Sequence, residues 1–272
     1  MPSLDENLTK WTQHGWPMDG DEWSTLGGGS FNWWHGLILP RLAPSLHAIS
    51  SGADALHCDR ILEIAPGHGR WTQFLLNHCD HLIGVDLVDE CTQHCARIFA
   101  SHPTQHEFHT NDGRTLPMVA DASIDLVFSW DSLVHAELDV IESYLRECRR
   151  VLRTGGRAFL HHSNLAQYKD VSGNITVDRP HWRAESVSAS MVDAICGQLG
   201  ITCVNQEVIT KGQQLDDGIC IDCVTVIENT PPAPGHHTWV VRNGSFWREI
   251  HAMGRVRKTY DLASFPEDKR PT

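Results

Sequence analysis

Short apolar runs alternate with helical stretches from about residue 60 to residue 227, and this alternation restricts the fold more than any other feature of the sequence. Five early runs are short and apolar enough to be buried strands: residues 61–65, 81–87, 107–110, 124–129 and 157–161. Strands that alternate with helices in this way form a mostly parallel sheet with helices on both faces. Two later runs, 201–209 and 219–227, follow each other without a helix. The pattern predicts an α/β fold with a doubly wound, seven-stranded, mostly parallel sheet and a C-terminal antiparallel hairpin.

The segments on either side of this region have a different composition. Residues 1–58 are rich in tryptophan and contain Gly27-Gly28-Gly29, so we expect an N-terminal helical lid with a glycine hinge. A Pro-rich linker at 231–235 leads into the C-terminal end. The sequence therefore predicts three parts: the lid at 1–58, the sheet domain at 59–228 and a tail of unassigned structure at 229–272.

Charge and cysteine content limit the partners and the compartment. Asp and Glu number 34 against 22 Lys and Arg, which gives a net charge of −12 at pH 7. Nucleic-acid binding draws on cationic groups, so we expect no nucleic-acid substrate but a small molecule or a neutral glycan. No apolar stretch is long enough for a membrane span, and no signal peptide is evident. With nine cysteines, an odd number, these features predict a reduced, cytoplasmic compartment.

The segment ILEIAPGHGRW at residues 61–71 contains the most informative motif. A buried strand runs directly into Gly67-His68-Gly69 and then into a helical stretch. The glycines allow a tight turn and a close approach to a ligand, at the crevice where such sheets bind ligands. Thr72 stands where a dinucleotide-binding motif would place its third glycine. Glu63 lies within the strand, an unusual position for a carboxylate unless a cation or a helix end is near.

Acidic residues follow the next strands. Asp86 ends the second strand, where a carboxylate can accept hydrogen bonds from both ribose hydroxyls. Asn111-Asp112-Gly113 follows the third strand, and residues 125–131 form the fourth strand and its exit.

This order of motifs, over about residues 60–164, resembles class I methyltransferases that depend on S-adenosylmethionine (SAM). The resemblance implies a Rossmann-like fold in which Gly67 and Gly69 flank the cofactor, Asp86 holds the ribose and Asp112 contacts the adenine amine. It also implies that Ser129 and Trp130 border the methionine end, and Glu63 matches the acidic position of the first family motif. The expected cofactor-binding residues are Glu63, Ala65, Gly67, Gly69, Asp86, Asp112, Gly113, Ser129, Trp130 and, from the lid, Trp34. The alternative is a nucleotide-binding fold that takes NAD or no ligand.

The catalytic residues are sought near the ends of the fourth and fifth strands. Methyl transfer requires an aligned nucleophile and exclusion of water, and a hydroxyl nucleophile also needs a base, commonly His. WDSLVHAE offers Asp131 and His135, and FLHHSNL offers His161 and His162, which alternate in direction if the strand persists. We predict His135 and His162 as catalytic residues. Asp131 would orient a His or, together with His162, hold a magnesium ion; the alternative role for Asp131 is a helix N-cap.

The combination of DSLVH with a later HHSN resembles bacterial sugar and polysaccharide O-methyltransferases, some of which are magnesium-dependent. This narrower resemblance implies methylation of a sugar or oligosaccharide hydroxyl, with a His base and magnesium assistance. The Asn-Pro-Pro-aromatic motif of amide N-methyltransferases is replaced by Asp131-Ser132-Leu133-Val134. Two alternatives stay open: O- or N-methylation of a natural product or amine, and a SAM-binding protein without catalysis. A homodimer is the expected assembly.

Overall fold

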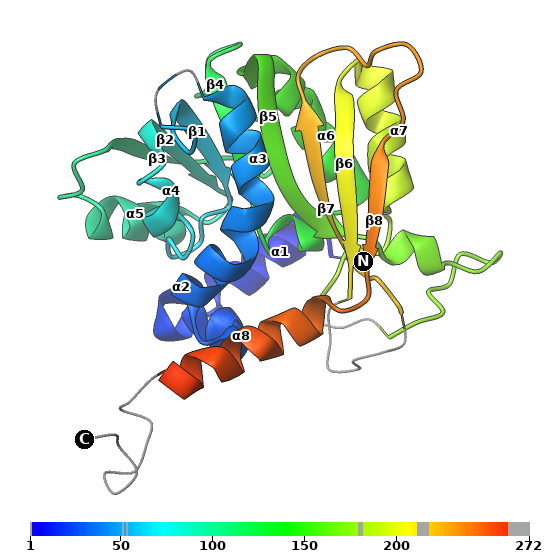
Figure 1. The fold of residues 1–272 in the computed structure, drawn as a ribbon, viewed down its shortest axis with the longest axis horizontal. Helices are drawn as coiled ribbons and strands as arrows, with labels where there is room; N and C mark the ends of the chain where they lie inside the picture. Colours follow the sequence, from blue (N-terminus) through cyan, green and yellow to red (C-terminus); the bar gives the residue numbers. More distant parts are fainter. Residues whose placement is uncertain (1, 51, 53, 179–181, 211–217, 261–272) are drawn as a thin grey trace, which may run out of the picture.

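The computed structural model describes residues 2–50, 52, 54–178, 182–210 and 218–260. Within these residues eight strands form one sheet, with helices on both of its faces (Figure 1). The sheet order is β3-β2-β1-β4-β5-β7-β6-β8. The strands are β1 (Cys58–Ile64), β2 (Cys79–Asp86), β3 (Gln105–Thr110), β4 (Ile124–Ser129), β5 (Leu152–Ser163), β6 (Thr202–Ile209), β7 (Asp222–Glu228) and β8 (Trp239–Asn243). The predicted Rossmann-like α/β class is confirmed.

The pairing of the strands agrees with the predicted topology except at one edge. Strands β3, β2, β1, β4 and β5 pair in parallel, whereas β7 runs antiparallel to both β5 and β6. The C-terminal antiparallel hairpin is therefore confirmed. The predicted count of seven strands is wrong, because β8 adds an eighth strand parallel to β6. This edge strand has five residues and most of its side chains are exposed, so its sequence shows no apolar alternation.

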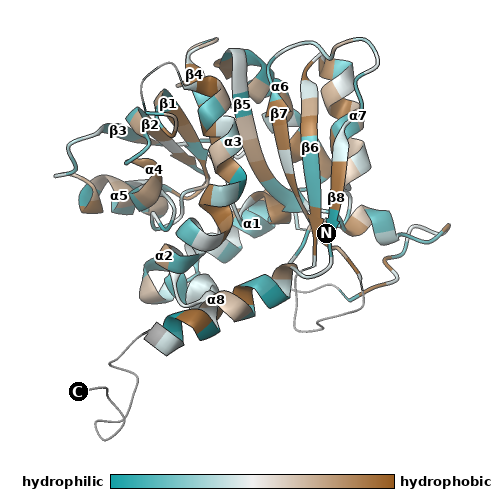
Figure 2. Ribbon diagram, in the orientation of Figure 1, coloured by the Kyte–Doolittle hydropathy of each residue, from teal (hydrophilic) through white to brown (hydrophobic). Residues whose placement is uncertain are grey.

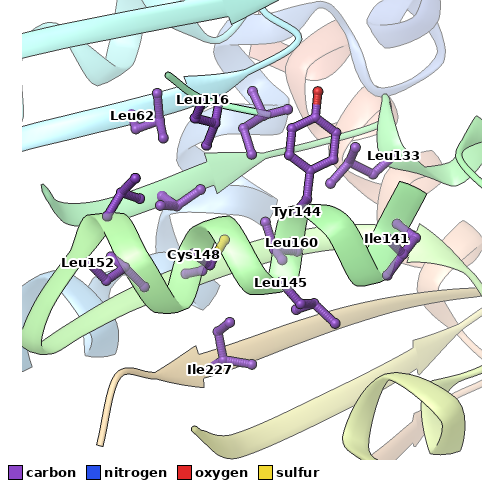
Figure 3. Packing of buried hydrophobic residues seen from close by; sticks show 14 of the residues in the cluster. Leu62, Leu116, Leu133, Ile141, Tyr144, Leu145, Cys148, Leu152, Leu160 and Ile227 are labelled. Carbon is purple, nitrogen blue, oxygen red and sulfur yellow. The ribbon is translucent and has the colours of Figure 1, made fainter. Parts of the chain in front are cut away.

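The main core lies between the sheet and two helices, α6 (Leu138–Val151) and α7 (Ala189–Leu199). Every third or fourth residue of α6 is buried, so one face of the helix packs on the sheet. Figure 3 shows Tyr144, Leu145 and Cys148 of this face close to Leu62 of β1 and Ile227 of β7. Hydrophobic residues also predominate along β1 and β7 (Figure 2). This layer supports the strand ends that carry the site.

The other face of the sheet is covered by α3 (Leu39–Ile49), α4 (Thr72–Leu75) and α5 (Asp89–Ile98). The chain reaches α3 through α1 (Leu4–Thr12), the 3-10 segment η1 (Pro17–Gly27), α2 (Ser30–Trp33) and the π-turn η2 (Trp34–Ile38). Short 3-10 turns η3 (Leu133–His135) and η4 (Leu165–Tyr168) follow β4 and β5. The N-terminal segment is thus helical, as predicted, and its role as a lid stays a prediction. In the described part of the chain, no helix has the length and apolar character needed to cross a bilayer.

The C-terminal segment contributes to the fold instead of extending from it as a tail. After β8, helix α8 (Phe246–Tyr260) runs below the sheet and lies against η1 and α2 (Figure 1). The approach is close: a Cβ on Gly254 would lie 2.5 Å from the Leu26 carbonyl oxygen. Likewise, a Cβ on Gly27 would lie 2.2 Å from Trp33 Nε1. Gly27 therefore allows tight packing in this arrangement, in addition to any hinge freedom.

Candidate active site

A cavity of about 700 Å³ opens at the carboxyl ends of β1, β2 and β4. Its walls come from the loops after these strands, from η3 and from the N-terminal segment, with Trp182, Arg183 and Trp247 added from later parts of the chain. Strands β1 and β4 are neighbours at the point where the strand order reverses, which is where open α/β sheets bind their ligands. The volume falls within the ~300–1,000 Å³ of ordinary ligand pockets.

The loop after β1 forms one wall of this cavity. Ala65 and Gly67 both line it with φ of +58°, a left-handed conformation that favours glycine. A Cβ on Gly67 would come within 2.9 Å of the Trp16 indole, so only glycine allows the N-terminal segment to pack this closely on the loop. Gly69, with φ of +84°, faces away from the cavity, and a Cβ there would meet the Phe99 ring at 2.7 Å.

Asp86 lies on the floor of the cavity at the end of β2. Its Oδ2 accepts a 3.0 Å hydrogen bond from the Gly67 N–H, and its Oδ1 accepts one of 2.9 Å from the Val88 N–H. Burial raises the pKa of Asp86 to about 6, against the opposing effect of these backbone hydrogen bonds. At neutral pH Asp86 is thus mainly a carboxylate able to accept hydrogen bonds from a ligand hydroxyl. Gly113 and Trp130, also predicted, line the same cavity.

Four other predicted cofactor residues lie off the cavity surface. Glu63 is buried beneath the loop, where it accepts a 2.6 Å hydrogen bond from Thr72 Oγ1, and burial raises its pKa to about 8. Ser129 donates to the Ile64 carbonyl oxygen over 3.0 Å. The exposed Asp112 accepts from the N–H groups of Arg114 and Thr115, in the turn after β3. These three polar groups support the turns around the site.

Trp34 is the fourth residue off the cavity, and its neighbour Trp33 lines the cavity instead. Trp34 stacks on Phe74 with ring centroids 5.3 Å apart and is buried in the core beneath α3. Successive residues in a helical turn point about 100° apart, so one tryptophan of the pair faces the cavity and the other the core. Trp34 is therefore a core residue and not, as predicted, a residue of the cavity.

Asp131 follows β4 and lines the cavity in a left-handed conformation with φ of +64°. Its backbone N–H donates to His161 Nδ1 over 3.1 Å. Its carboxylate lies between two guanidinium groups, with Oδ2 at 3.4 Å from Arg70 Nη2 and Oδ1 at 3.7 Å from Arg183 Nη2. A non-glycine residue in this conformation needs such support from its surroundings.

Behind Asp131 lies a buried polar network that the sequence analysis did not find. Arg183 donates two hydrogen bonds to Asp222, of 2.9 and 3.0 Å, and His161 Nε2 lies 3.4 Å from the same carboxylate. The side chains of these three residues are at most 2% exposed. Burial opposes the charge of Arg183, but Asp222 and Asp131 together raise its pKa. The network therefore fixes the charged wall of the cavity around Asp131.

His135 lines the cavity from η3. Its Nδ1 is 2.8 Å from the Trp182 carbonyl oxygen. Because a carbonyl only accepts hydrogen bonds, Nδ1 carries the proton, and in the neutral ring the lone pair is on Nε2. The imidazole also contacts Trp11, with ring centroids 5.1 Å apart. His135 thus has the tautomer that a general base at Nε2 requires.

The position of His162 does not agree with its predicted catalytic role. Its ring is fully buried away from the cavity, with Nε2 at 2.8 Å from Thr225 Oγ1 and Nδ1 at 2.9 Å from the Ser163 carbonyl oxygen. Burial lowers its pKa to about 4, so the ring is neutral. His161 points to the cavity side instead, with its ring 4.7 Å from that of Trp130. Neighbouring side chains on a strand point to opposite faces, and here His161 is the one that packs behind the cavity wall.

The predicted magnesium ligands do not fit the ion. Asp131 lines the cavity, whereas the His162 ring is buried away from it, and neither belongs to a group of the described residues that could hold a metal. The two guanidinium groups beside Asp131 would also repel a divalent cation. Both ring nitrogens of His162 are hydrogen-bonded elsewhere. We therefore derive no step through magnesium at these residues.

The remaining cavity wall is strongly aromatic. Among the described residues, eight tryptophans line the cavity: Trp11, Trp16, Trp23, Trp33, Trp71, Trp130, Trp182 and Trp247. They come from α1, η1, α2, α8 and four separate loops, so only the fold brings them together. Arg70 packs over one of them, with Cζ 4.5 Å from the centroid of the Trp71 ring. A ligand with flat apolar faces and polar edges suits this wall.

Residues 61–156 match a family model described as a methyltransferase domain. A search of curated proteins finds no significant match. Among solved structures, the chain is similar to a SAM-dependent methyltransferase from Clostridium acetobutylicum, with 14% identity, a TM-score of 0.54, and coverage of 74% of this chain and 92% of that one. It is also similar to a SAM-dependent methyltransferase from Mesorhizobium loti, with 15% identity, a TM-score of 0.53, and coverage of 75% of this chain and 99% of that one. A third similar structure is a geranyl diphosphate methyltransferase in complex with SAM, with 12% identity, a TM-score of 0.54, and coverage of 72% of this chain and 85% of that one. At these identities the structures show a shared fold.

Proposed function

We propose that the chain is a class I SAM-dependent methyltransferase and that it methylates a hydroxyl group of a sugar or oligosaccharide; the match of residues 61–156 to a methyltransferase-domain model supports the first part. The main observation is that one cavity has two parts with different linings. The loop after β1 and Asp86 form a cofactor half, and the tryptophans, Asp131 and His135 form the other. A shared cavity lets an acceptor approach the transferable methyl group directly, without water between them. The indole rings suit the apolar faces of a sugar ring.

In the cofactor half, Asp86 would accept the ribose hydroxyls, and Gly67 would allow the backbone to approach the ligand closely. When bound, SAM supplies a methyl group activated by its sulfonium. The indole of Trp130 would lie near that positive charge, where an aromatic face is favourable. These residues orient the cofactor, and the N-terminal tryptophans exclude water.

In the acceptor half, His135 is the proposed general base. The acceptor hydroxyl would donate its proton to His135 Nε2, so that its oxygen could accept the methyl group that bound SAM would supply. The hydrogen bond from Nδ1 to the Trp182 carbonyl oxygen holds the ring in the tautomer that accepts this proton. Asp131, held between Arg70 and Arg183, would accept a second hydroxyl of the acceptor and orient it. The cytoplasmic location and the homodimer stay predictions of the sequence.

The proposal is tested by methyl transfer from labelled SAM to a panel of neutral, acidic and amino sugars, oligosaccharides and simple amines. We expect label on a sugar oxygen, located by mass spectrometry. His135→Gln should lower turnover by about 10²–10⁴-fold, since general-base assistance is lost, while SAM affinity is unchanged. His106→Gln, a histidine on β3 away from the cavity, is the matched control. Label only on amine nitrogen, or full turnover by His135→Gln, would overturn the proposal.

A further inference from the structure

Three potential metal ligands meet beside the cavity, where the N-terminal segment touches the loop after β1. Asp19 comes from η1, His68 from the loop and His94 from α5. One ligand atom of each lies within 4.8 Å of the other two. The His68 side chain is only 8% exposed and lines the cavity. Parts of the chain that are distant in sequence are therefore joined by groups able to share an ion.

Two nitrogens of this cluster lack the partners that buried polar atoms require. Among the described residues, no hydrogen-bond partner exists for His68 Nδ1 or for His94 Nε2, and both atoms are buried. The nearest carboxylate oxygen to His68 Nδ1, Asp19 Oδ1, is 3.8 Å away, too far for a hydrogen bond. Buried polar atoms are nearly always satisfied, and an ion is one way to satisfy these two.

The other nitrogen of His68 has the partner that metal-binding histidines usually have. His68 Nε2 is 2.9 Å from Glu90 Oε2, and the carboxylate holds the proton on Nε2. In the neutral ring the lone pair is then on Nδ1, the nitrogen without a partner. Histidines that bind metals commonly donate their second N–H to a carboxylate in this way, which fixes both the tautomer and the ring orientation.

We propose that Asp19, His68 and His94 bind a divalent transition-metal ion such as Zn²⁺, through an Asp19 carboxylate oxygen, His68 Nδ1 and His94 Nε2. Imidazole and carboxylate ligands suit zinc and its neighbours, whereas magnesium prefers oxygen alone. Three protein ligands leave a position for water in a tetrahedral site.

Binding of the ion requires two local changes. The His68 and His94 rings are stacked, with centroids 3.8 Å apart and an angle of 13°, so an ion cannot lie in both ring planes until one ring turns. Arg97 Nη2 lies 3.0 Å from His94 Nδ1, where the guanidinium donates to that nitrogen. When Nε2 binds the metal, Nδ1 carries the proton and Arg97 must leave. Arg97 is exposed, so its side chain has room to move.

A second group, His68, Glu90 and Cys91, lies at the same place and shares His68. Cys91 in that group is fully buried, so an ion bound by its sulfur would have to enter the protein interior. Glu90 is also engaged with the nitrogen of His68 that the proposed site leaves protonated. The group with Asp19 is therefore the better site.

The ion would fasten η1 to the loop after β1 and to α5. Trp16 already stacks on His68 with centroids 4.7 Å apart, and Met18 and Asp19 have left-handed backbones with φ of +54° and +52°. Such a conformation is retained only where the surroundings stabilise it. A shared ion at Asp19 would do so, and would keep the N-terminal segment closed over the cofactor half. This inference does not depend on the identity of the acceptor.

The test is zinc binding by the full chain, freed of metal with a chelator and then titrated against a chromophoric competitor. We expect one ion per chain, with affinity at least about 10-fold lower in Asp19→Asn and in His94→Gln. His57→Gln, which removes a surface histidine paired with Asp80, should bind as the wild type does. Arg97→Gln should bind more tightly, because His94 Nδ1 is then free to carry its proton.

Limited proteolysis gives a second readout that does not involve activity. Zinc should slow cleavage within residues 13–22 of the wild type, and should have no such effect in His94→Gln. Circular dichroism checks that the variants are folded; Asp19 is exposed and His94 half-buried, so we expect both substitutions to be tolerated. The proposal is overturned if the wild type binds no stoichiometric zinc, or if binding persists in both variants and is lost in Cys91→Ser.

Discussion

The backbone N–H of Gly67 donates a 3.0 Å hydrogen bond to Asp86 Oδ2, which ties the loop after β1 to the end of β2. The same carboxylate also accepts the Val88 N–H, so both of its oxygens hold backbone turns at the floor of the cavity. Each oxygen has a further lone pair for a ligand hydroxyl. One side chain therefore orders the cofactor loop and, in the proposed complex, binds the ribose.

Asp86→Ala should weaken SAM binding by about 1.5–3 kcal/mol, because a charge-assisted hydrogen bond is lost and the loop after β1 is released. Isothermal calorimetry measures the affinity directly. Asp89→Asn is the control, since Asp89 is close by on α5 but does not line the cavity. Unchanged affinity in a folded Asp86→Ala would remove this residue from the cofactor site.

The affinity for SAM should fall as the pH decreases below about 6, because protonated Asp86 accepts ribose hydroxyls poorly. The contribution of Asp86 to stability changes with pH in the opposite direction. Burial raises the pKa of Asp86 above the 3.8 of the unfolded chain, so its contribution to the free energy of unfolding is fully present below pH 3.8 and is lost as the pH rises through 6. Calorimetry between pH 5 and pH 8 tests the first effect. Asp86→Asn should abolish this pH dependence, and a pH-independent wild type would contradict it.

His162→Ala should destabilise the fold by about 1–3 kcal/mol, since the hydrogen bond to Thr225 is lost in the core, and should leave turnover intact. Burial lowers the pKa of His162 to about 4, below the 6.5 of the unfolded chain. Its contribution to stability is therefore present above pH 6.5 and is lost as the pH falls through 4. Urea denaturation at several pH values measures both effects. A loss of turnover as large as that of His135→Gln would instead return His162 to the active site.

Arg183→Met should lower the free energy of unfolding by about 3–5 kcal/mol, because it leaves Asp222 buried without its cation. The double variant Arg183→Met/Asp222→Leu should recover much of this loss, since neither charge is then buried alone. Arg146→Met on the exposed side of α6 removes an ion pair with Glu142 and should cost less than about 0.5 kcal/mol. If the single and double variants were equally stable, the network would not have the proposed coupling.

Gly254→Ala should separate α8 from the N-terminal segment, because its Cβ would lie 2.5 Å from the Leu26 carbonyl oxygen. We expect a loss of about 1–3 kcal/mol from overpacking, and faster proteolysis of residues 17–27. Gly197→Ala on α7 is a suitable control, since a Cβ there meets nothing within 4 Å. Equal proteolysis of Gly254→Ala and wild type would show that α8 does not hold this segment.

The sequence was sufficient to predict those elements whose burial produces a recognisable pattern of apolar residues. Strands covered on both faces are mostly apolar, so β1, β2, β4 and β7 could be recognised from their composition. Strand β8 could not, because it lies at an exposed edge. Helix α8 has apolar residues at helical spacing, Phe246, Ile250 and Met253, so its sequence did contain a signal that was not used. Both elements are placed by contacts with residues far away in the chain.

What the sequence by itself determined is the local chemistry of the cofactor loop: a buried strand, glycines in the turn that follows it, and an acidic residue at the end of the next strand. Those features lie within one continuous strand–helix–strand stretch, residues 58–86. Only the tertiary structure decided that His161, and not His162, packs behind the cavity-lining residues Trp130 and Asp131, and that Arg70 and Arg183 flank Asp131. The first depends on which face of β5 meets the site. The second depends on packing between residues at least fifty positions apart, which no local pattern encodes.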